Sequence, residues 1–113
     1  MSVSPATRAF VLELFDDLGG VTARPMMGGL MLHRDGRVFG LVSSAGRVYL
    51  KAAGDFAAAL AAEGAEQFRP TRRDGVTASM GYWSLPEAAL DDPDAACDWA
   101  RRALDATGLA GGR

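Results

Sequence analysis

The chain has 113 residues, of which 49% are apolar and 23% charged. This is the size and composition of one ordinary domain with a single core, and it excludes both a disordered chain and a membrane protein with a long apolar span. The formal net charge of -2 and the pI of about 5.2 argue against a protein that mainly adheres to nucleic acid or to anionic lipid.

The cysteine content and the amino terminus indicate the compartment. Cys97 is the only cysteine, so the chain cannot form an internal disulfide or a multi-cysteine zinc site. Residues 1–8 lack the basic stretch and the following apolar stretch of a signal peptide. We therefore expect a cytoplasmic protein that needs no cofactor.

The first predicted element is a helix over residues 5–18. Ser4 is a good capping residue, and Pro5 fits the first turn of a helix, where its missing N–H is harmless. The apolar side chains that follow share one stripe, which we expect to face the core: Phe10, Val11, Leu14, Phe15 and Leu18. Gly19 and Gly20 end the helix, because glycine readily adopts a left-handed backbone.

The pattern then alternates with a period of two, which is typical of strands. It predicts strands over residues 21–26, 30–34, 37–42 and 47–51. Asp35-Gly36 predicts a two-residue hairpin turn, and residues 43–46 a looser one. Gly28 and Gly29 lie between the first two strands, where we expect a tight connection or a bulge in which side chains would collide.

The second half of the chain continues the alternation of helix and sheet. It predicts a short helix over residues 56–63 that ends at Gly64, and a hairpin of residues 68–72 and 76–84 around Asp74-Gly75. A last helix runs from Pro93 to about residue 107, with Gly108 as its cap. The order is α-β-β-β-β-α-β-β-α: one α+β domain over residues 1–113, whose antiparallel sheet of five to six strands has helices on one face.

The residues that could carry catalysis or bind a metal have simpler interpretations. His33 is isolated and is expected to be a solvent-facing strand residue, and Cys97 is expected to pack as a small hydrophobic side chain. Asp91, Asp92 and Asp94 precede or begin a helix, where carboxylates satisfy free amide groups. We therefore expect no catalytic residue and no metal site.

The last helix also carries the pair Arg101-Arg102, which resembles a basic patch. Asp98 lies four residues before Arg102, and Arg101 lies four residues before Asp105. This spacing predicts two ion pairs on a solvated helix face.

A set of polar and aromatic residues is the best candidate for an interaction face. Alternation places Arg47, Tyr49 and Lys51 on one face of a strand, and we expect Trp83 to join them from the later hairpin together with Thr77 and Ser79. Arginine and aromatic side chains together are typical of protein-binding hot spots and also of surfaces on which nucleotides stack. An ordinary solvated face and a face covered by a symmetric partner subunit remain open as alternatives.

Five stretches of the chain, in order, resemble the amino-terminal domain of the TfoX/Sxy family of bacterial competence regulators. They are Arg24-Pro-Met-Met-Gly-Gly29, Arg34-Asp-Gly-Arg-Val-Phe-Gly-Leu41, Gly46-Arg-Val-Tyr-Leu-Lys51, Met80-Gly-Tyr-Trp-Ser-Leu-Pro86 and the helix from Asp92-Pro93 through Trp99-Ala-Arg-Arg-Ala-Leu104. The resemblance implies an α+β domain of the secretion chaperone-like kind, often dimeric, with no known catalytic residues to transfer. It also implies a regulatory association, because the best-known members assist the cyclic-AMP receptor protein at competence promoters. Those members continue into a helical carboxy-terminal domain, whereas this sequence ends at Arg113, so we expect a stand-alone amino-terminal domain.

Together these observations predict a non-enzymatic, cytoplasmic interaction module that acts through protein contacts, in transcription regulation of the competence type. The expected partners are another protein and a second copy of the chain, with nucleic acid contacted only indirectly and no membrane. The alternative hypothesis is a module that binds a small ligand or nucleic acid through Arg47, Tyr49 and Lys51.

Overall fold

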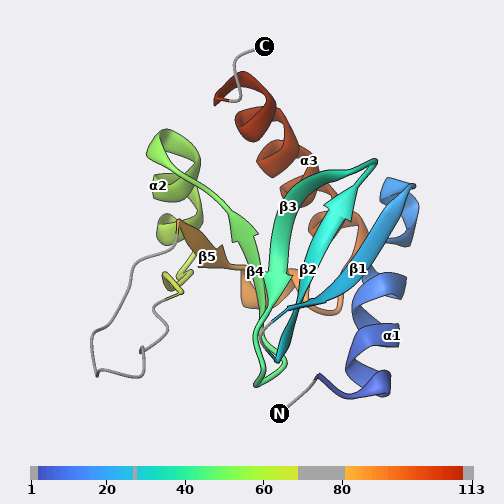
Figure 1. The fold of residues 1–113 in the computed structure, drawn as a ribbon. Coiled ribbons are helices and arrows are strands. Elements are labelled where there is room, and N and C mark those ends of the chain that lie inside the picture. Colours follow the sequence, from blue (N-terminus) through green and yellow to red (C-terminus); the bar gives the residue numbers. More distant parts are fainter. Residues whose placement is uncertain (1–2, 27, 69–80, 111–113) are drawn as a thin grey trace, which may run out of the picture.

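A five-stranded antiparallel sheet and three α-helices make up the described part of the chain, which comprises residues 3–26, 28–68 and 81–110 of a computed structural model. The elements in chain order are α1 (Pro5–Leu14), the 3₁₀ turn η1 (Asp16–Leu18), β1 (Val21–Met26), β2 (Gly29–Arg34), β3 (Arg37–Val42), β4 (Val48–Lys51), α2 (Gly54–Ala62), β5 (Tyr82–Ser84), the 3₁₀ turn η2 (Glu87–Ala89) and α3 (Pro93–Ala110). The strands lie side by side in the order β1-β2-β3-β4-β5 (Figure 1). The predicted α+β class and the antiparallel sheet are confirmed.

The main core lies between the helices and one face of the sheet. In Figure 1, α3 passes behind β3, and α1 lies beside β1; α3 also contacts β4. The face of α3 toward the sheet carries small buried side chains: Ala96, Cys97, Ala100 and Ala103. Small side chains allow the helix axis to approach the strands closely, so that larger apolar groups of the sheet and of α1 fill the space around it.

The first helix is shorter than predicted. Ser4 caps it as expected, since its hydroxyl accepts a hydrogen bond from the Thr7 amide at 3.1 Å. The α-helix ends at Leu14, because the backbone of Phe15 leaves the helical region, and the 3₁₀ turn η1 follows. Gly19 and Gly20 then have φ values of 77° and 73°, so the predicted stop lies after η1.

One member of the predicted core stripe faces solvent. Phe10 is 45% exposed, whereas Val11 and Phe15 are fully buried. The prediction that Phe10 belongs to the core is wrong. A stripe of i, i+3, i+4 spacing is wider than the contact between α1 and the sheet, so a residue at its edge remains accessible.

The turn between β2 and β3 is confirmed, and a bulge follows it. Asp35 and Gly36 have φ values of 51° and 84°, as a two-residue hairpin turn requires. Leu32 pairs with Gly40 whereas His33 pairs with Val38, which leaves Phe39 without a partner. The bulge thereby turns the Phe39 ring into the main core.

The second half of the chain agrees in part with the sequence predictions. α2 begins and ends within two residues of the predicted helix, and Gly64 follows it with a φ of 89°. The predicted Asp74-Gly75 hairpin lies outside the described residues; β5 is the described part of its second strand, and Gln67 forms an isolated bridge with Trp83 on its outer side. Gly108 does not cap the last helix, because α3 continues through it to Ala110.

The two glycines between β1 and β2 have different roles. Gly28 has a φ of 85°, which other residues rarely adopt. Gly29 pairs within the sheet, and a Cβ atom there would collide with the carbonyl oxygen of Val42.

The outer edge of β1 is occupied at two of its positions. The Arg8 guanidinium donates a hydrogen bond to the carbonyl oxygen of Ala23 at 3.2 Å. Pro25 lies two residues further along the strand and has no N–H to donate. Both features limit pairing of this edge with another strand.

Gly40 offers a test of the packing between β3 and β4. A Cβ atom at this position would collide with the backbone carbonyl oxygen of Tyr49, which cannot move without shifting β4. We expect Gly40→Ala to lower the free energy of unfolding by about 2 kcal/mol or more, measured by urea denaturation. Gly54→Ala is the control, because Gly54 has open space around it and only its φ of 57° to strain; a smaller loss in Gly40→Ala than in the control would contradict this account.

Candidate functional site

The face of the sheet opposite the helices carries a second group of apolar side chains, which we call the sheet-face cluster. Its members are the buried Leu41, Tyr49 and Tyr82 and the partly buried Met31, Val38 and Phe68. The strand register brings them together, because Leu41 pairs with Tyr49 and Tyr82 pairs with Lys51. The Phe68 and Tyr49 rings pack with their centroids 4.7 Å apart. Burial raises the pKa of the Tyr82 phenol.

The structure brings together only part of the interaction face predicted from the sequence. Arg47, Tyr49 and Lys51 lie on the sheet-face side as expected, but Tyr49 is only 8% exposed. Trp83 pairs with Leu50 and packs against the main core, so it lies on the other face of the sheet. The prediction that placed Trp83 beside Tyr49 is wrong, because β5 pairs with β4 in a register that puts Ser84 opposite Tyr49. The predicted Thr77 and Ser79 lie outside the described residues.

Arg47 is the residue of the predicted set with the most contacts. Its guanidinium lies 5.6 Å from the centroid of the Tyr49 ring, forms an ion pair with Glu66 at 2.7 Å and donates to the Ser84 hydroxyl at 3.3 Å. The hydrogen bond with Glu66 is the main cause that raises the pKa of Arg47. The side chain is nevertheless 48% exposed, so it is held in place and remains accessible.

The cations that flank the sheet-face cluster are exposed. Arg24 on β1 and Lys51 on β4 both point to the cluster side, as the register of Arg24 with Met31 and of Lys51 with Tyr82 requires. Neither forms an ion pair within the described residues. Met26, on the same side of β1, is 45% exposed. This face therefore combines accessible apolar surface with unpaired positive charge.

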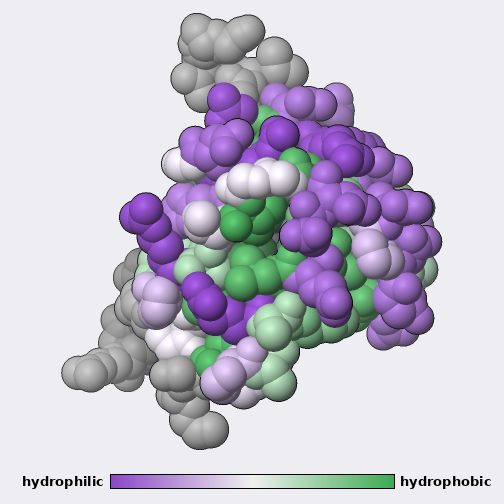
Figure 2. Space-filling model, turned by 90° about the vertical axis from the view of Figure 1, so that its right-hand side faces the viewer, coloured by the Kyte–Doolittle hydropathy of each residue, from purple (hydrophilic) through white to green (hydrophobic). Residues whose placement is uncertain are grey.

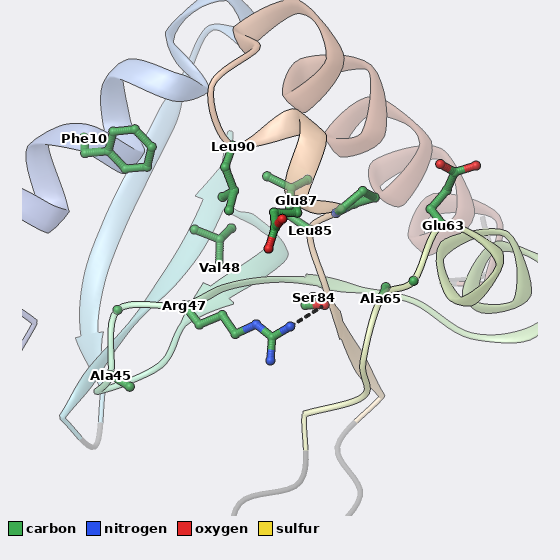
Figure 3. Close-up of a pocket in the computed structure, with 13 residues that line it drawn as sticks. Phe10, Ala45, Arg47, Val48, Glu63, Ala65, Ser84, Leu85, Glu87 and Leu90 are labelled. Atoms are coloured by element: carbon green, nitrogen blue, oxygen red, sulfur yellow. Dashed lines mark hydrogen bonds between the residues drawn. The ribbon is translucent and has the colours of Figure 1, made fainter.

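A hollow of about 590 Å³ adjoins this face where the start of β4, the end of β5, the segment after α2 and the η2 segment meet, with Phe10 of α1 at its border (Figure 3). Its apolar wall is formed by Phe10, Val48, Leu85 and Leu90, and its polar groups are Arg47, Ser84, Glu63 and Glu87. Figure 3 shows the Glu87 carboxylate pointing into the hollow toward Arg47, whereas the Glu63 carboxylate points away. The volume lies within the range of ordinary small-molecule sites, roughly 300–1,000 Å³.

Sequence reasoning did not find this hollow. The apolar stripe of the first helix predicts Phe10 in the core, and Glu63, Glu66 and Glu87 carry no motif. The hollow exists because four separate segments of the chain converge, namely Phe10 and residues 45–48, 63–65 and 84–90, and no local pattern signals that convergence. The available signal was the alternation of β5, which places Ser84 on the face of Arg47.

The side of the molecule formed by α1 and β1 also exposes apolar side chains. Figure 2 shows an apolar area on this side surrounded by hydrophilic side chains. The accessible apolar residues on these two elements include Phe10, which is exposed, and Leu12 and Val21, which are partly buried. Phe10 also lines the hollow.

Some of the residues considered for catalysis or metal binding have structural roles. Cys97 is 1% exposed, and its thiol lies 3.7 Å from the carbonyl oxygen of Leu14. Asp92 accepts a hydrogen bond from the Ala95 amide at 3.2 Å and so caps α3. His33 is half-buried rather than solvent-facing and stands next to the register shift of the bulge, and its Nδ1 atom has no hydrogen-bond partner within the described residues. No group of three His, Cys, Asp or Glu side chains in the described part of the chain is arranged to hold a metal ion.

The arginines of α3 differ from the prediction. Arg101 pairs with Asp98 at 2.9 Å rather than with Asp105. Arg102 lies over the rings of Trp99 and Phe56, at 4.6 and 5.4 Å from their centroids, instead of pairing with Asp98. Arg102 therefore joins α3 to α2 through cation–π contacts.

The fold and these surfaces define a small α+β domain in which none of the described helices covers the second face of the sheet, with a hollow beside that face. The model of the TfoX N-terminal domain family matches residues 13–107, and the chain belongs to this family. No curated protein sequence matches the chain at a significant level. None of the helices within the described residues combines the length and the apolar composition needed to cross a membrane.

The ion pair of Arg47 should contribute little to stability. Because both side chains are largely exposed, at 48% and 70%, solvent screening limits the contribution of the pair to about 1 kcal/mol at most. We expect Glu66→Gln to change the free energy of unfolding by no more than that, measured by urea denaturation at low and high salt. Asp98→Asn, which breaks the exposed pair on α3, is the matched control. A loss of several kcal/mol specific to Glu66→Gln would show that the pair is essential for folding.

The thiol of Cys97 should be protected in the folded protein. Burial raises its pKa, so the folded state favours the protonated thiol. The corresponding stabilisation is present below the ordinary thiol pKa and is lost as the pH rises through that value toward the folded one. We expect iodoacetamide at mildly alkaline pH to alkylate the native protein at least about a hundredfold more slowly than the urea-unfolded protein. Equal rates for the two states would contradict the buried position.

Proposed function

We propose that this domain is a non-enzymatic interaction module that binds a partner protein on the sheet face opposite the helices. We propose further that it serves in transcription regulation of the competence type. Membership of the TfoX N-terminal domain family supports the regulatory assignment. The observation that carries the binding assignment is the sheet-face cluster, flanked by the exposed cations Arg24 and Lys51, which form no ion pair with any described residue.

The chemistry of this face specifies the kind of partner. Met26, at 45% exposure, and the half-buried Met31 are flexible apolar side chains that adapt to a partner surface. The exposed charges beside them, Arg24 and Lys51, are positive. The partner is therefore a protein segment that presents apolar side chains together with carboxylates.

A protein partner fits better than a nucleic acid. Stacking of bases requires an accessible aromatic ring face, whereas the Tyr49 ring is 8% exposed and lies under Arg47 and against Phe68. The acidic pI of about 5.2 also argues against nucleic-acid binding.

The roles of two candidate reactive groups support the non-enzymatic assignment. Cys97 is buried in the main core, and Asp92 caps α3. Localisation in the cytoplasm is part of the same proposal, because a regulator of transcription in bacteria acts there.

The proposal is tested by charge reversal on the sheet face. We expect the double variant Arg24→Glu, Lys51→Glu to bind the partner at least about tenfold more weakly, because it replaces attraction by repulsion. The measurement is affinity capture from cells of the source organism, with mass spectrometry and nuclease treatment, followed by titration of the purified partner. Arg101→Glu, on the surface of α3, is the matched control and should bind normally.

Three outcomes would each contradict a different part of the proposal. Equal binding by the double variant and the control would contradict the assigned face. Nuclease-sensitive binding with a steep salt dependence would replace the protein partner by nucleic acid. A partner with no role in transcription would contradict the regulatory assignment while leaving the binding face in place.

A further inference from the structure

We infer that the hollow beside β4 and β5 is a binding site for an apolar α-amino acid in its zwitterionic form. The site is separate in position from the sheet face, although Arg47 borders both. The inference rests on the positions of one cation, one anion, one buried hydroxyl and an apolar wall.

The carboxylate of the ligand would meet Arg47 and Ser84. A guanidinium has five N–H donors, and the contacts of Arg47 use one toward Glu66 and one toward Ser84. Ser84 is 2% exposed, and its hydroxyl accepts from both Arg47 and the Glu66 amide, at 3.3 and 2.9 Å. Its oxygen is thereby satisfied as an acceptor, which leaves its hydrogen free to be donated to an anionic oxygen in the hollow.

The ammonium group of the ligand would meet Glu87. The Glu87 carboxylate points into the hollow toward Arg47 (Figure 3), and it forms no ion pair within the described residues. A ligand with a carboxylate alone would be repelled by Glu87 and Glu66. A zwitterion avoids this repulsion, because its positive group faces Glu87 while its negative group faces Arg47.

The side chain of the ligand would lie against the apolar wall. Phe10 is 45% exposed on α1, and Val48 and Leu90 complete the wall beside it. Burial of the ligand's apolar side chain against these residues supplies binding energy that a polar amino acid lacks. The structure thus selects leucine, methionine or phenylalanine over glycine or serine.

The test is a titration followed by amide chemical shifts in two-dimensional NMR spectra. The probes are L-leucine, which has all three features, and glycine, N-acetyl-leucine and leucinamide, which lack the side chain, the ammonium charge and the carboxylate respectively. We expect leucine to shift the amide signals of Val48, Ser84 and Leu85 in a saturable way. Each of the other three probes should bind at least about tenfold more weakly, because each loses one of the three contacts.

Two variants test which residue contacts the ammonium group of the ligand and which contacts its carboxylate. Glu87→Gln should weaken leucine binding and remove the preference for leucine over N-acetyl-leucine, and Arg47→Gln should remove the preference for leucine over leucinamide. Asp91→Asn and Arg101→Gln, outside the hollow, are the controls and should bind leucine normally. A thermal denaturation curve for each variant separates loss of the site from loss of the fold.

Several results would overturn the inference. These are absence of saturable shifts with leucine, shifts confined to residues outside the hollow, and equal binding of N-acetyl-leucine or leucinamide, which would show that one charge contact is not made. The outcome is independent of the partner-binding experiment, because Arg24 and Lys51 do not line the hollow.

Discussion

The close packing of α3 against the sheet is the constraint on which the rest of this structure depends. Ala96, Ala100 and Ala103 present almost no side-chain volume to the strands, so the helix lies near them and the larger apolar groups of α1 and the sheet fill the surrounding space. All three helices contribute to this one core. Within the described residues, the apolar side chains on the other face pack against one another, as Tyr49 and the partly buried Phe68 do.

The same arrangement explains which parts of the fold could be predicted from the sequence. Local chemistry determines the Asp35-Gly36 turn, the Ser4 cap and the start of α3, and each of these was predicted from a few neighbouring residues. The break after Leu14 and the bulge at Phe39 depend on contacts between distant segments, which no local pattern records. Gly108 is a related case, because the helix continues through a residue that usually ends one.

The candidate sites show the same division. Alternation placed Arg47, Tyr49 and Lys51 correctly on one side of β4, but it could not show that Phe68 and Tyr82 would cover Tyr49. The face of Trp83 depended on the pairing register between β4 and β5, which joins segments more than thirty residues apart. Residue type and spacing thus indicated where to look, whereas burial decided which of those residues a ligand can reach.

The hydrogen bonding at the two edges of the sheet limits how copies of this protein can assemble. At one edge, Arg8 donates a hydrogen bond to a carbonyl group of β1, and Pro25 has no N–H group to donate. At the other edge, Gln67 and its neighbours already pair with β5. Lateral growth of the sheet, in which copies add strand to strand into a continuous ribbon, is thereby disfavoured at both ends. Association that involves the sheet is directed to its broad surface, where side chains rather than backbone groups determine which molecule fits.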